Sequence, residues 1–346
     1  MTKYSFKDDY SEGAHPSVLQ ALLETNFEQQ DGYGNDLYSK QAVEILKNKM
    51  DNQESDIHFV SGGTQANMIV ISSILKPHEA VIAASTGHIN VHEAGAVEST
   101  GHKINMVVTK DGKLSPELIQ PVLEEHSDEH MVKPKLVYIS NTTEVGSVYT
   151  KKELERLSSF CKQNNLLLYL DGARIGSAIC SKKSGLELSD LPKFTDVFYI
   201  GGTKNGALLG EAIVINNADL KKDFRYYLKQ KGALLAKGRI LGLQFLTLFK
   251  DDLYLKLAAH SNSMSEKLYS AITNFGFEFL SKPESNQIFP IFPNEIIVEL
   301  LKDYEFYTWE KVDENKQAVR LVTSWATKEE VVDKFIEDLK KIANIN

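Results

Sequence analysis

Seven short apolar runs, separated by helical or turn patterns, constrain the fold of this chain more than any other feature of its sequence. Runs of four or five residues bounded by glycine and polar residues are typical of buried strands. Between them lie helical patterns such as Glu153–Cys161, which Thr150 can cap. The seven runs are Ile57–Val60, Ala80–Ala84, Ile104–Val108, Leu136–Ile139, Leu166–Leu170, Val197–Ile200 and Ala212–Ile215.

Strands that alternate with helices predict mostly parallel pairing through right-handed crossovers, and hence an α/β sheet with helices on both faces. Ligands of such sheets bind at the carboxyl ends of the strands. After Asp219 the pattern changes to long helical stretches, and from about Asn262 a smaller α+β segment follows. We therefore expect a large sheet domain followed by a small C-terminal domain.

Composition excludes several classes of protein. With 346 residues, 42% of them hydrophobic, the chain can bury a large core and enclose a site. A net charge of −8 without a basic stripe argues against a nucleic-acid partner. No apolar run reaches the length of a signal peptide or a membrane span, and Cys161 and Cys180 have no metal or redox spacing. These features predict a cytoplasmic protein with reduced cysteines and no membrane partner.

Lys204 lies among glycines between the last two apolar runs, in the segment Gly201–Gly206. This position predicts a lysine on a turn between two strands. Burial would lower its pKa and make the neutral amine a nucleophile toward a carbonyl group. The alternative is a solvated lysine at the end of a hairpin.

The segment Ser61–Asn67 follows the first apolar run and precedes an apolar helix. Glycines at a helix N-terminus expose backbone N–H groups, and the helix dipole adds positive potential, so the segment can cradle a phosphate. It is neither a Gly-x-Gly-x-x-Gly motif nor a Walker loop, and a plain strand-to-helix turn is an equal alternative.

Asp171 ends another apolar run, and Arg174 follows three residues later. A buried carboxylate needs a positive partner, and Arg174 could supply it in a purely structural ion pair. Alternatively, Asp171 pairs with a protonated heterocyclic nitrogen while Arg174 faces a substrate carboxylate with its bidentate fork.

His88 and His92 are spaced i and i+4 in a helical segment, which could form half of a zinc site. No third ligand has a recognisable spacing, so we predict no metal and prefer His88 as a flat ring offered at a helix start. Arg320 lies on a strand of the small domain, where it either covers the sheet surface or faces the interdomain cleft as a second anion binder.

Taken together, these motifs resemble the fold-type I pyridoxal-phosphate enzymes, most closely the family of threonine aldolases and β-eliminating lyases. The resemblance extends over nearly the whole chain and keeps the family's order. The motifs are Asp8-Asp9-Tyr10, Gly32-Tyr-Gly-Asn-Asp36, Ser61–Asn67, His88–Gly95, Asp171-Gly-Ala-Arg174, Gly201-Gly-Thr-Lys204 and Arg320-Leu-Val-Thr323. The resemblance implies three parts of the chain. They are an arm at residues 1–16, a large cofactor domain with a mostly parallel seven-stranded sheet at 17–250, and a small α+β domain at 251–346.

The resemblance implies a role for each residue that would touch the cofactor, pyridoxal 5′-phosphate. Lys204 would hold it as a Schiff base, and Asp171 would keep its ring nitrogen protonated so that the ring can take up electrons. His88 would stack on the ring, and Gly63 and Thr64 would cradle the phosphate.

Other roles implied by the resemblance concern the substrate and a neighbouring subunit. Arg174, beside the cofactor, and Arg320 would clamp the substrate carboxylate, and His130 would lie near the substrate hydroxyl. A homo-oligomer, dimer or tetramer, would share active sites between subunits. Lys237 or Arg239 would contact the phosphate in a neighbouring subunit's site, and Tyr33 would also reach into an adjoining site.

The implied reaction is cleavage of a β-hydroxy amino acid such as L-threonine or L-allo-threonine to glycine and an aldehyde, with His88 or His130 as base or hydroxyl orienter. Three alternatives stay open at this point. They are a β-eliminating lyase with the same cofactor, a Rossmann-type nucleotide-binding protein and a cofactor-binding module without catalysis.

Two segments depart from the pattern common in the family. Lys7 stands where a serine usually faces the substrate carboxylate, so a flexible cation takes the place of a small hydroxyl. The segment Ser140–Gly146 replaces a Glu-Asn-Thr-His pattern. Both departures leave a β-hydroxy amino acid other than threonine possible as the substrate.

Overall fold

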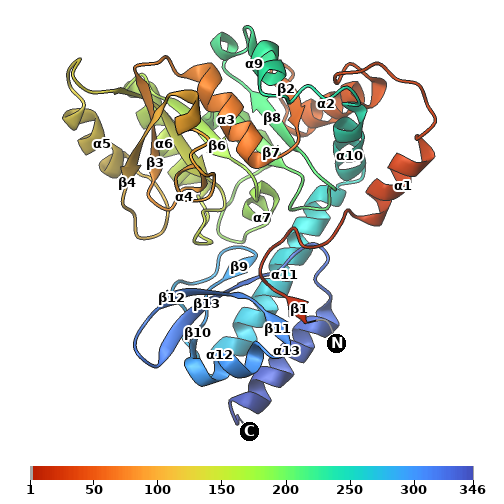
Figure 1. Ribbon diagram of the computed structural model, residues 1–346, viewed down its shortest axis with the longest axis vertical. Helices are drawn as coiled ribbons and strands as arrows, with labels where there is room; N and C mark the ends of the chain where they lie inside the picture. Colours follow the sequence, from red (N-terminus) through yellow and green to blue (C-terminus); the bar gives the residue numbers. More distant parts are fainter. Residues whose placement is uncertain (1–2, 346) are drawn as a thin grey trace.

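The computed structural model describes residues 3–345. Residues 1, 2 and 346, at the ends of the expected arm and small domain, lie outside the described residues. Two parts stand one above the other in Figure 1, a large sheet domain and a smaller domain built mainly from the C-terminal third of the chain. The domain boundaries at residues 16 and 250 stay a prediction.

The seven predicted strands form one sheet, with the order β2-β8-β7-β6-β5-β3-β4. Pairing is parallel except around β8, which runs antiparallel to β2 and β7. The strands are β2 (Asp56–Val60), β3 (Glu79–Ala84), β4 (Lys103–Val107), β5 (Lys133–Ser140), β6 (Leu167–Asp171), β7 (Val197–Gly201) and β8 (Glu211–Ile215).

Helices cover both faces of this sheet, because alternate strand residues pack to opposite sides: Val137 faces one cluster and Leu136 the other. One layer contains α2 (Leu37–Lys49), α5 (Pro116–Glu125), α6 (Lys151–Gln163), α7 (Ile175–Ile179), α8 (Leu191–Phe194) and α10 (Arg239–Lys250). The other contains α3 (Gly63–Ile74), α4 (His88–Val91) and α9 (Phe224–Gln230). The helix α1 (Pro16–Glu24) lies against α10.

The small domain is an antiparallel sheet packed on helices. Its main strands are β10 (Ile291–Pro293), β12 (Tyr307–Lys311) and β13 (Lys316–Val322), with β9 (Gln287–Ile288) also paired to β13. The start of the chain joins this domain, because β1 (Tyr4–Ser5) pairs with β11 (Tyr304–Glu305). The helices are α12 (Asn294–Leu300), α13 (Glu329–Ile342) and the second half of α11 (Leu253–Asn274).

The long helix α11 connects the two domains (Figure 1). Tyr254 and Leu257, in its first turns, belong to the core of the large domain. Met264, Leu268 and Ile272 belong to the core of the small domain. One continuous helix therefore fixes the small domain against the sheet. Within residues 3–345 we find no helix with the length and apolar character needed to cross a bilayer.

Close packing of α10 on α2 gives a test of this fold. A Cβ atom on Gly242 would lie 2.5 Å from the Cα of Ser39. We expect Gly242→Ala to lower the unfolding free energy by about 1–3 kcal/mol through overpacking, more than the ~1 kcal/mol that alanine gains in a helix. Urea denaturation measures the change. Gly13→Ala, where no atom lies within 4 Å of the new Cβ, is the control; equal stability of the two variants would contradict the packing.

Candidate active site

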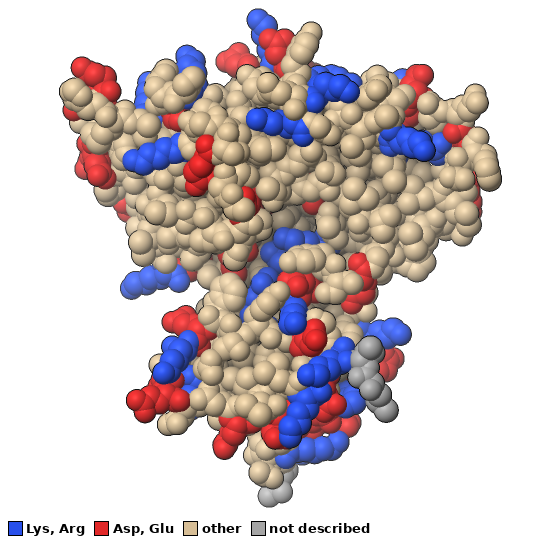
Figure 2. All heavy atoms as spheres, viewed as in Figure 1, with Lys and Arg blue, Asp and Glu red and all other residues tan. Residues whose placement is uncertain are grey.

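A cleft of about 770 Å³ lies between the large sheet and the small domain. Strand ends and turns of the large sheet form one wall, while β12, β13 and the N-terminal segment supply the other. Figure 2 shows a waist at this level, where Lys and Arg side chains lie beside Asp and Glu side chains. Asp171, Lys204 and Arg320, which the sequence places in one site, all line this cleft.

Lys204 lies in the turn between the antiparallel strands β7 and β8. The turn is tight, since a Cβ on Gly202 would lie 2.7 Å from the carbonyl oxygen of Gly210. The Lys204 Nζ lies 5.9 Å from the ring centroid of Tyr10. Burial, with the nearby charge of Arg174, holds the pKa of Lys204 below its ordinary value. A larger share of the amine is therefore neutral and nucleophilic.

Asp171 is the last residue of β6 and is buried at the cleft. Its carboxylate accepts four hydrogen bonds, at 2.6 Å from the Tyr138 hydroxyl, 2.5 Å from the Tyr199 hydroxyl, 3.1 Å from the Asn67 amide and 3.0 Å from the Ala173 N–H. Burial alone would raise the pKa of Asp171, but the His88 charge and the hydroxyl donors outweigh it and hold the pKa below its usual range. The structure thus keeps a buried carboxylate ionised.

His88 begins α4 and lines the same cleft. Its Nδ1 lies 2.7 Å from Oε1 of Glu93. Burial lowers the pKa of His88, but the hydrogen bond to Glu93 and the charges of Glu144 and Asp171 raise it above its ordinary value overall. The ring of His92 lies 5.5 Å away, and within residues 3–345 no three His, Cys, Asp or Glu side chains group as a metal site.

The N-terminus of α3 opens into the cleft, where Ser61, Gly62, Gly63 and Thr64 line it. Gly62 is the N-cap and offers no side-chain hydrogen bond. A Cβ there would meet no atom within 4 Å, so the space beside the N-cap is open. This twelve-residue helix therefore presents an anion-binding end to the cleft.

Two guanidinium groups line the cleft, and each has a partner other than Asp171. Arg174 donates to Asp9 from Nε at 2.7 Å and from Nη2 at 3.1 Å. Arg320 donates from Nε and Nη2 to the Gln287 side chain at 3.2 and 2.8 Å. Of the two alternatives left open for Arg174, the structural ion pair with Asp171 is therefore not formed. Asp9 takes up the Nε–Nη2 edge of the Arg174 guanidinium group. The remaining N–H groups of Arg174 are left for a ligand.

His130 and Lys7 do not line the cleft. His130 is exposed in the loop that precedes β5, and its backbone N–H is held by Asp128 at 3.0 Å. This loop is at the amino end of β5, whereas the cleft opens at the carboxyl ends. Lys7 pairs with Glu305 at 3.2 Å, with its Nζ 5.9 Å from the ring centroid of Tyr307 at the cleft wall.

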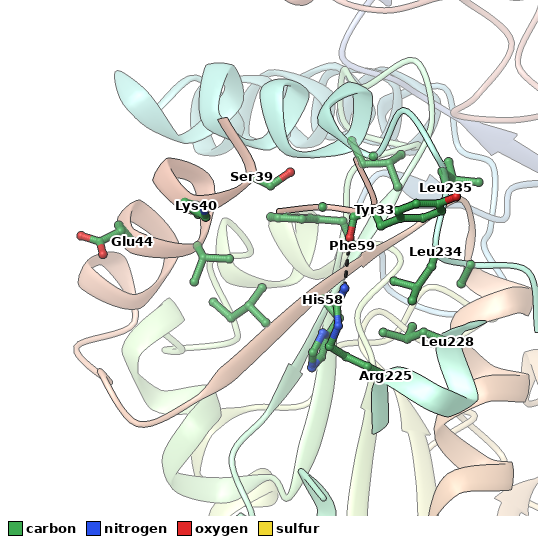
Figure 3. A pocket seen from close by; sticks show the side chains of 16 residues that line it. Tyr33, Ser39, Lys40, Glu44, His58, Phe59, Arg225, Leu228, Leu234 and Leu235 are labelled. Atoms are coloured by element: carbon green, nitrogen blue, oxygen red, sulfur yellow. Dashed lines mark hydrogen bonds between the residues drawn. The ribbon is translucent and has the colours of Figure 1, made fainter. Parts of the chain in front are cut away.

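The three residues predicted to act across a subunit boundary also lie away from the cleft of their own chain. Tyr33 instead lines a separate pocket of about 210 Å³ between α2, β2 and α9 (Figure 3). Its carbonyl oxygen accepts a 3.2 Å hydrogen bond from Arg225. Lys237 is exposed. Arg239 donates to two carbonyl oxygens of the segment between α1 and α2, at 2.7 and 2.8 Å.

Sequence reasoning missed several residues that shape the site. Tyr138 and Tyr199 hold Asp171, and the signal was available: a tyrosine inside a buried apolar run needs a partner for its hydroxyl. Asp9 had no such local signal, because its partner Arg174 is remote in sequence. Glu144 and Glu211 also line the cleft.

Comparisons with known proteins show which family this chain resembles in sequence and structure. The chain matches the β-eliminating lyase family model over residues 8–293. A low specificity L-threonine aldolase from a Pseudomonas species is 33% identical over 340 residues, 97% of this chain and 96% of that protein. A Leishmania major threonine aldolase structure has a TM-score of 0.97 at 47% identity, covering 98% of this chain and 99% of that one.

A more distant neighbour shares the fold alone. An aspartate aminotransferase of Thermus thermophilus has a TM-score of 0.71 at 16% identity, covering 98% of this chain and 91% of that one. Together with the seven-stranded sheet, these neighbours confirm the predicted fold class.

The buried carboxyl group of Glu211 gives a pH test of the Lys204 turn. It accepts hydrogen bonds of 2.9 Å from the Gly202 N–H and the Thr203 hydroxyl, while burial raises its pKa from 4.5 to about 7. The folded state therefore favours the protonated form, and this stabilisation is lost as the pH rises through about 7. Between pH 5 and 8 the wild type should lose about 2 kcal/mol of unfolding free energy relative to Glu211→Gln.

Urea unfolding of both proteins, in the same cofactor state and at several pH values, measures this difference. Because the glutamine stays neutral, the other titrating groups cancel in the comparison. Parallel pH profiles would mean that the Glu211 carboxyl ionises as it does in the unfolded chain.

Proposed function

Because this chain belongs to the β-eliminating lyase family, we propose that it cleaves L-threonine or L-allo-threonine to glycine and an aldehyde. The cofactor of the reaction is pyridoxal 5′-phosphate. The observation that carries the proposal is the meeting, in one cleft, of the Lys204 amine with the ionised Asp171 carboxylate. The named L-threonine aldolases among the relatives support the choice of substrate.

The residues of the cleft fit this cofactor. Lys204 offers an amine with a lowered pKa to an aldehyde group. Asp171 offers a carboxylate that stays ionised although buried, which suits a protonated ring nitrogen. Gly63 and Thr64, at the start of α3, would hold a phosphate, and His88 would lie on the ring.

When bound, pyridoxal phosphate supplies an electron sink for the bond that breaks at the substrate Cα. Arg174 and Arg320 would bind the substrate carboxylate through the N–H groups that Asp9 and Gln287 leave free. This contact fixes which Cα bond is aligned for cleavage, and that alignment decides between aldol cleavage and competing reactions. The Lys204 amine would supply or take up a proton at Cα.

We propose further that the chain works as a homo-oligomer, dimer or tetramer, with active sites shared between subunits. Large apolar side chains on α1 and after it support this: Leu19 is 48% exposed, Leu23 70% and Phe27 96%. Exposed apolar groups gathered in one region mark an interaction surface. In such an assembly Tyr33, Lys237 and Arg239 would reach a neighbouring site, and Lys7 would face the substrate from the cleft rim.

We also propose a cytoplasmic location. Cys161 and Cys180 are both free thiols, with Cys161 buried. The cytoplasm keeps thiols reduced, so unpaired cysteines suit that compartment.

Glycine release from L-threonine by the protein loaded with pyridoxal phosphate tests the main proposal. Replacing Lys204 with alanine should remove the amine and lower kcat/KM by at least about a thousandfold. Lys302→Ala, on the exposed surface, is the control. Borohydride reduction should place the covalent adduct on Lys204, and an adduct on another lysine would overturn the assignment.

The runner-up, a β-eliminating lyase, predicts other products. Pyruvate and ammonia from a β-substituted alanine, with no glycine from either threonine isomer, would favour it. A protein that takes up no pyridoxal phosphate would exclude both readings.

The proposed assembly is tested by the mass of the protein in solution. The double variant Leu23→Lys, Phe27→Glu places charges on the exposed apolar surface and should shift the protein to smaller species in sedimentation velocity, with reduced threonine cleavage. Val298→Glu, at a residue 59% exposed on α12, should leave the assembly intact. The proposal would be contradicted if the wild type were a monomer, or if the double variant formed an assembly of the same mass as the wild type.

A further inference from the structure

A rigid loop after β5 carries Glu144 into the cleft. The Thr143 N–H donates to the Ser147 carbonyl at 2.9 Å, and the Gly146 N–H to the Thr143 carbonyl at 3.0 Å. From the small domain, Gln287 donates to the Thr142 hydroxyl at 3.2 Å and to the Thr143 carbonyl at 3.3 Å. The loop thus holds the Glu144 backbone in a defined place between the two domains.

Glu144 lines the cleft together with His88 and His92. Burial lowers the pKa of both histidines and the Glu144 charge acts against it; the pKa of His88 is raised overall, while that of His92 stays below its ordinary value, with Glu144 as its largest charge effect. The Glu144 charge also acts on Lys204 and Arg174, so it shares one space with the groups proposed to hold cofactor and substrate. Glu144 is half-buried, and among residues 3–345 it has no hydrogen-bond or ion-pair partner.

Three other acidic groups line this cleft: Asp171 and Glu211 are buried and committed, and Asp8 belongs to the N-terminal segment on the other wall. Asp171 accepts four hydrogen bonds, and Glu211 holds the Lys204 turn through two. His88 has a raised pKa and is bonded through Nδ1, so it is suited to donate a proton rather than to accept one. An ionised carboxylate is a pure acceptor, and Glu144 has its lone pairs free.

We propose that Glu144 is the catalytic base that accepts the proton of the substrate's β-hydroxyl group. This inference rests on the proposed aldolase function. With the substrate carboxylate at Arg174 and Arg320 and its amine in the place of the Lys204 amine, we place the β-hydroxyl group beside Glu144, which lines the same cleft as these three residues.

The hydroxyl proton moves to a Glu144 oxygen, and the O–H electron pair forms the carbonyl bond of the leaving aldehyde. The Cα–Cβ bond breaks, and its electron pair stays with the glycine fragment, which later gains a proton at Cα. Glu144 returns its proton to solvent when the aldehyde leaves.

Two reactions of the holoenzyme separate this role from a general structural one. Glu144→Gln should lower threonine cleavage by roughly a hundredfold or more, in the range of general-base catalysis. The exchange of the glycine α-proton in D₂O needs no β-hydroxyl and should stay within about twofold. Glu144→Asp should restore part of the cleavage, and Glu310→Gln, an exposed acid on β12, should change neither rate.

A titration of the cofactor-free protein by NMR checks the geometry without any reaction. Glu144, His88, Arg320 and Lys204 line the cleft with His92, and their charges act on its pKa. Removing the Glu144 charge should lower the pKa of His92 and of His88. Unchanged histidine titrations would overturn the placement of Glu144.

The outcomes distinguish the two proposals. Equal threonine cleavage by wild type and Glu144→Gln, or a parallel loss of glycine exchange, would overturn the role of Glu144 alone. A wild-type holoenzyme that exchanges glycine protons but releases no glycine from threonine would overturn the proposed function, and this inference with it.

Discussion

The buried carboxylate of Asp171 organises the site, because a charge in this position is stable only if donors surround it. Tyr138 from β5, Tyr199 from β7 and Asn67 from α3 supply them. Asn67 also donates to Glu93 at 2.7 Å, and Glu93 in turn holds His88. One hydrogen-bonded chain therefore connects the Asp171 carboxylate at the sheet end with the His88 ring at the start of α4, and a positive charge on His88 lowers the pKa of Asp171.

A second buried charge pair joins parts of the molecule that are far apart in sequence. Asp9, in the N-terminal segment, pairs with Arg174 after β6, and it also accepts a 3.0 Å hydrogen bond from Asn286 of the small domain. Breaking such a pair would leave an uncompensated buried charge, at a cost of about 3–5 kcal/mol. The contact thus fixes the N-terminal segment and both domains around the cleft, and it orients Arg174 without filling all of its donors.

The cleft has a division of charge that matches the proposed chemistry. Lys204, Arg174, Arg320 and the start of α3 make it attractive to phosphate and carboxylate groups. Asp171 and Glu211 already accept hydrogen bonds from their own donors. They therefore leave the cationic groups available to a bound phosphate or carboxylate. Glu144, entering on the loop between β5 and α6, is an acceptor that this arrangement leaves open on the wall of the large domain.

Local sequence determined much of this protein. Each apolar run was long enough to predict its strand, and the alternation with helices predicted a mostly parallel sheet whose strand ends gather Asp171 and Lys204. Only the tertiary structure decided which groups meet across long separations: Asp9 with Arg174, Glu144 with the histidines, and His130 on the opposite end of the sheet. Strand and helix patterns repeat over a few residues and are visible in one stretch of chain. A charge pair or a cleft wall depends on packing between segments, which no single stretch records.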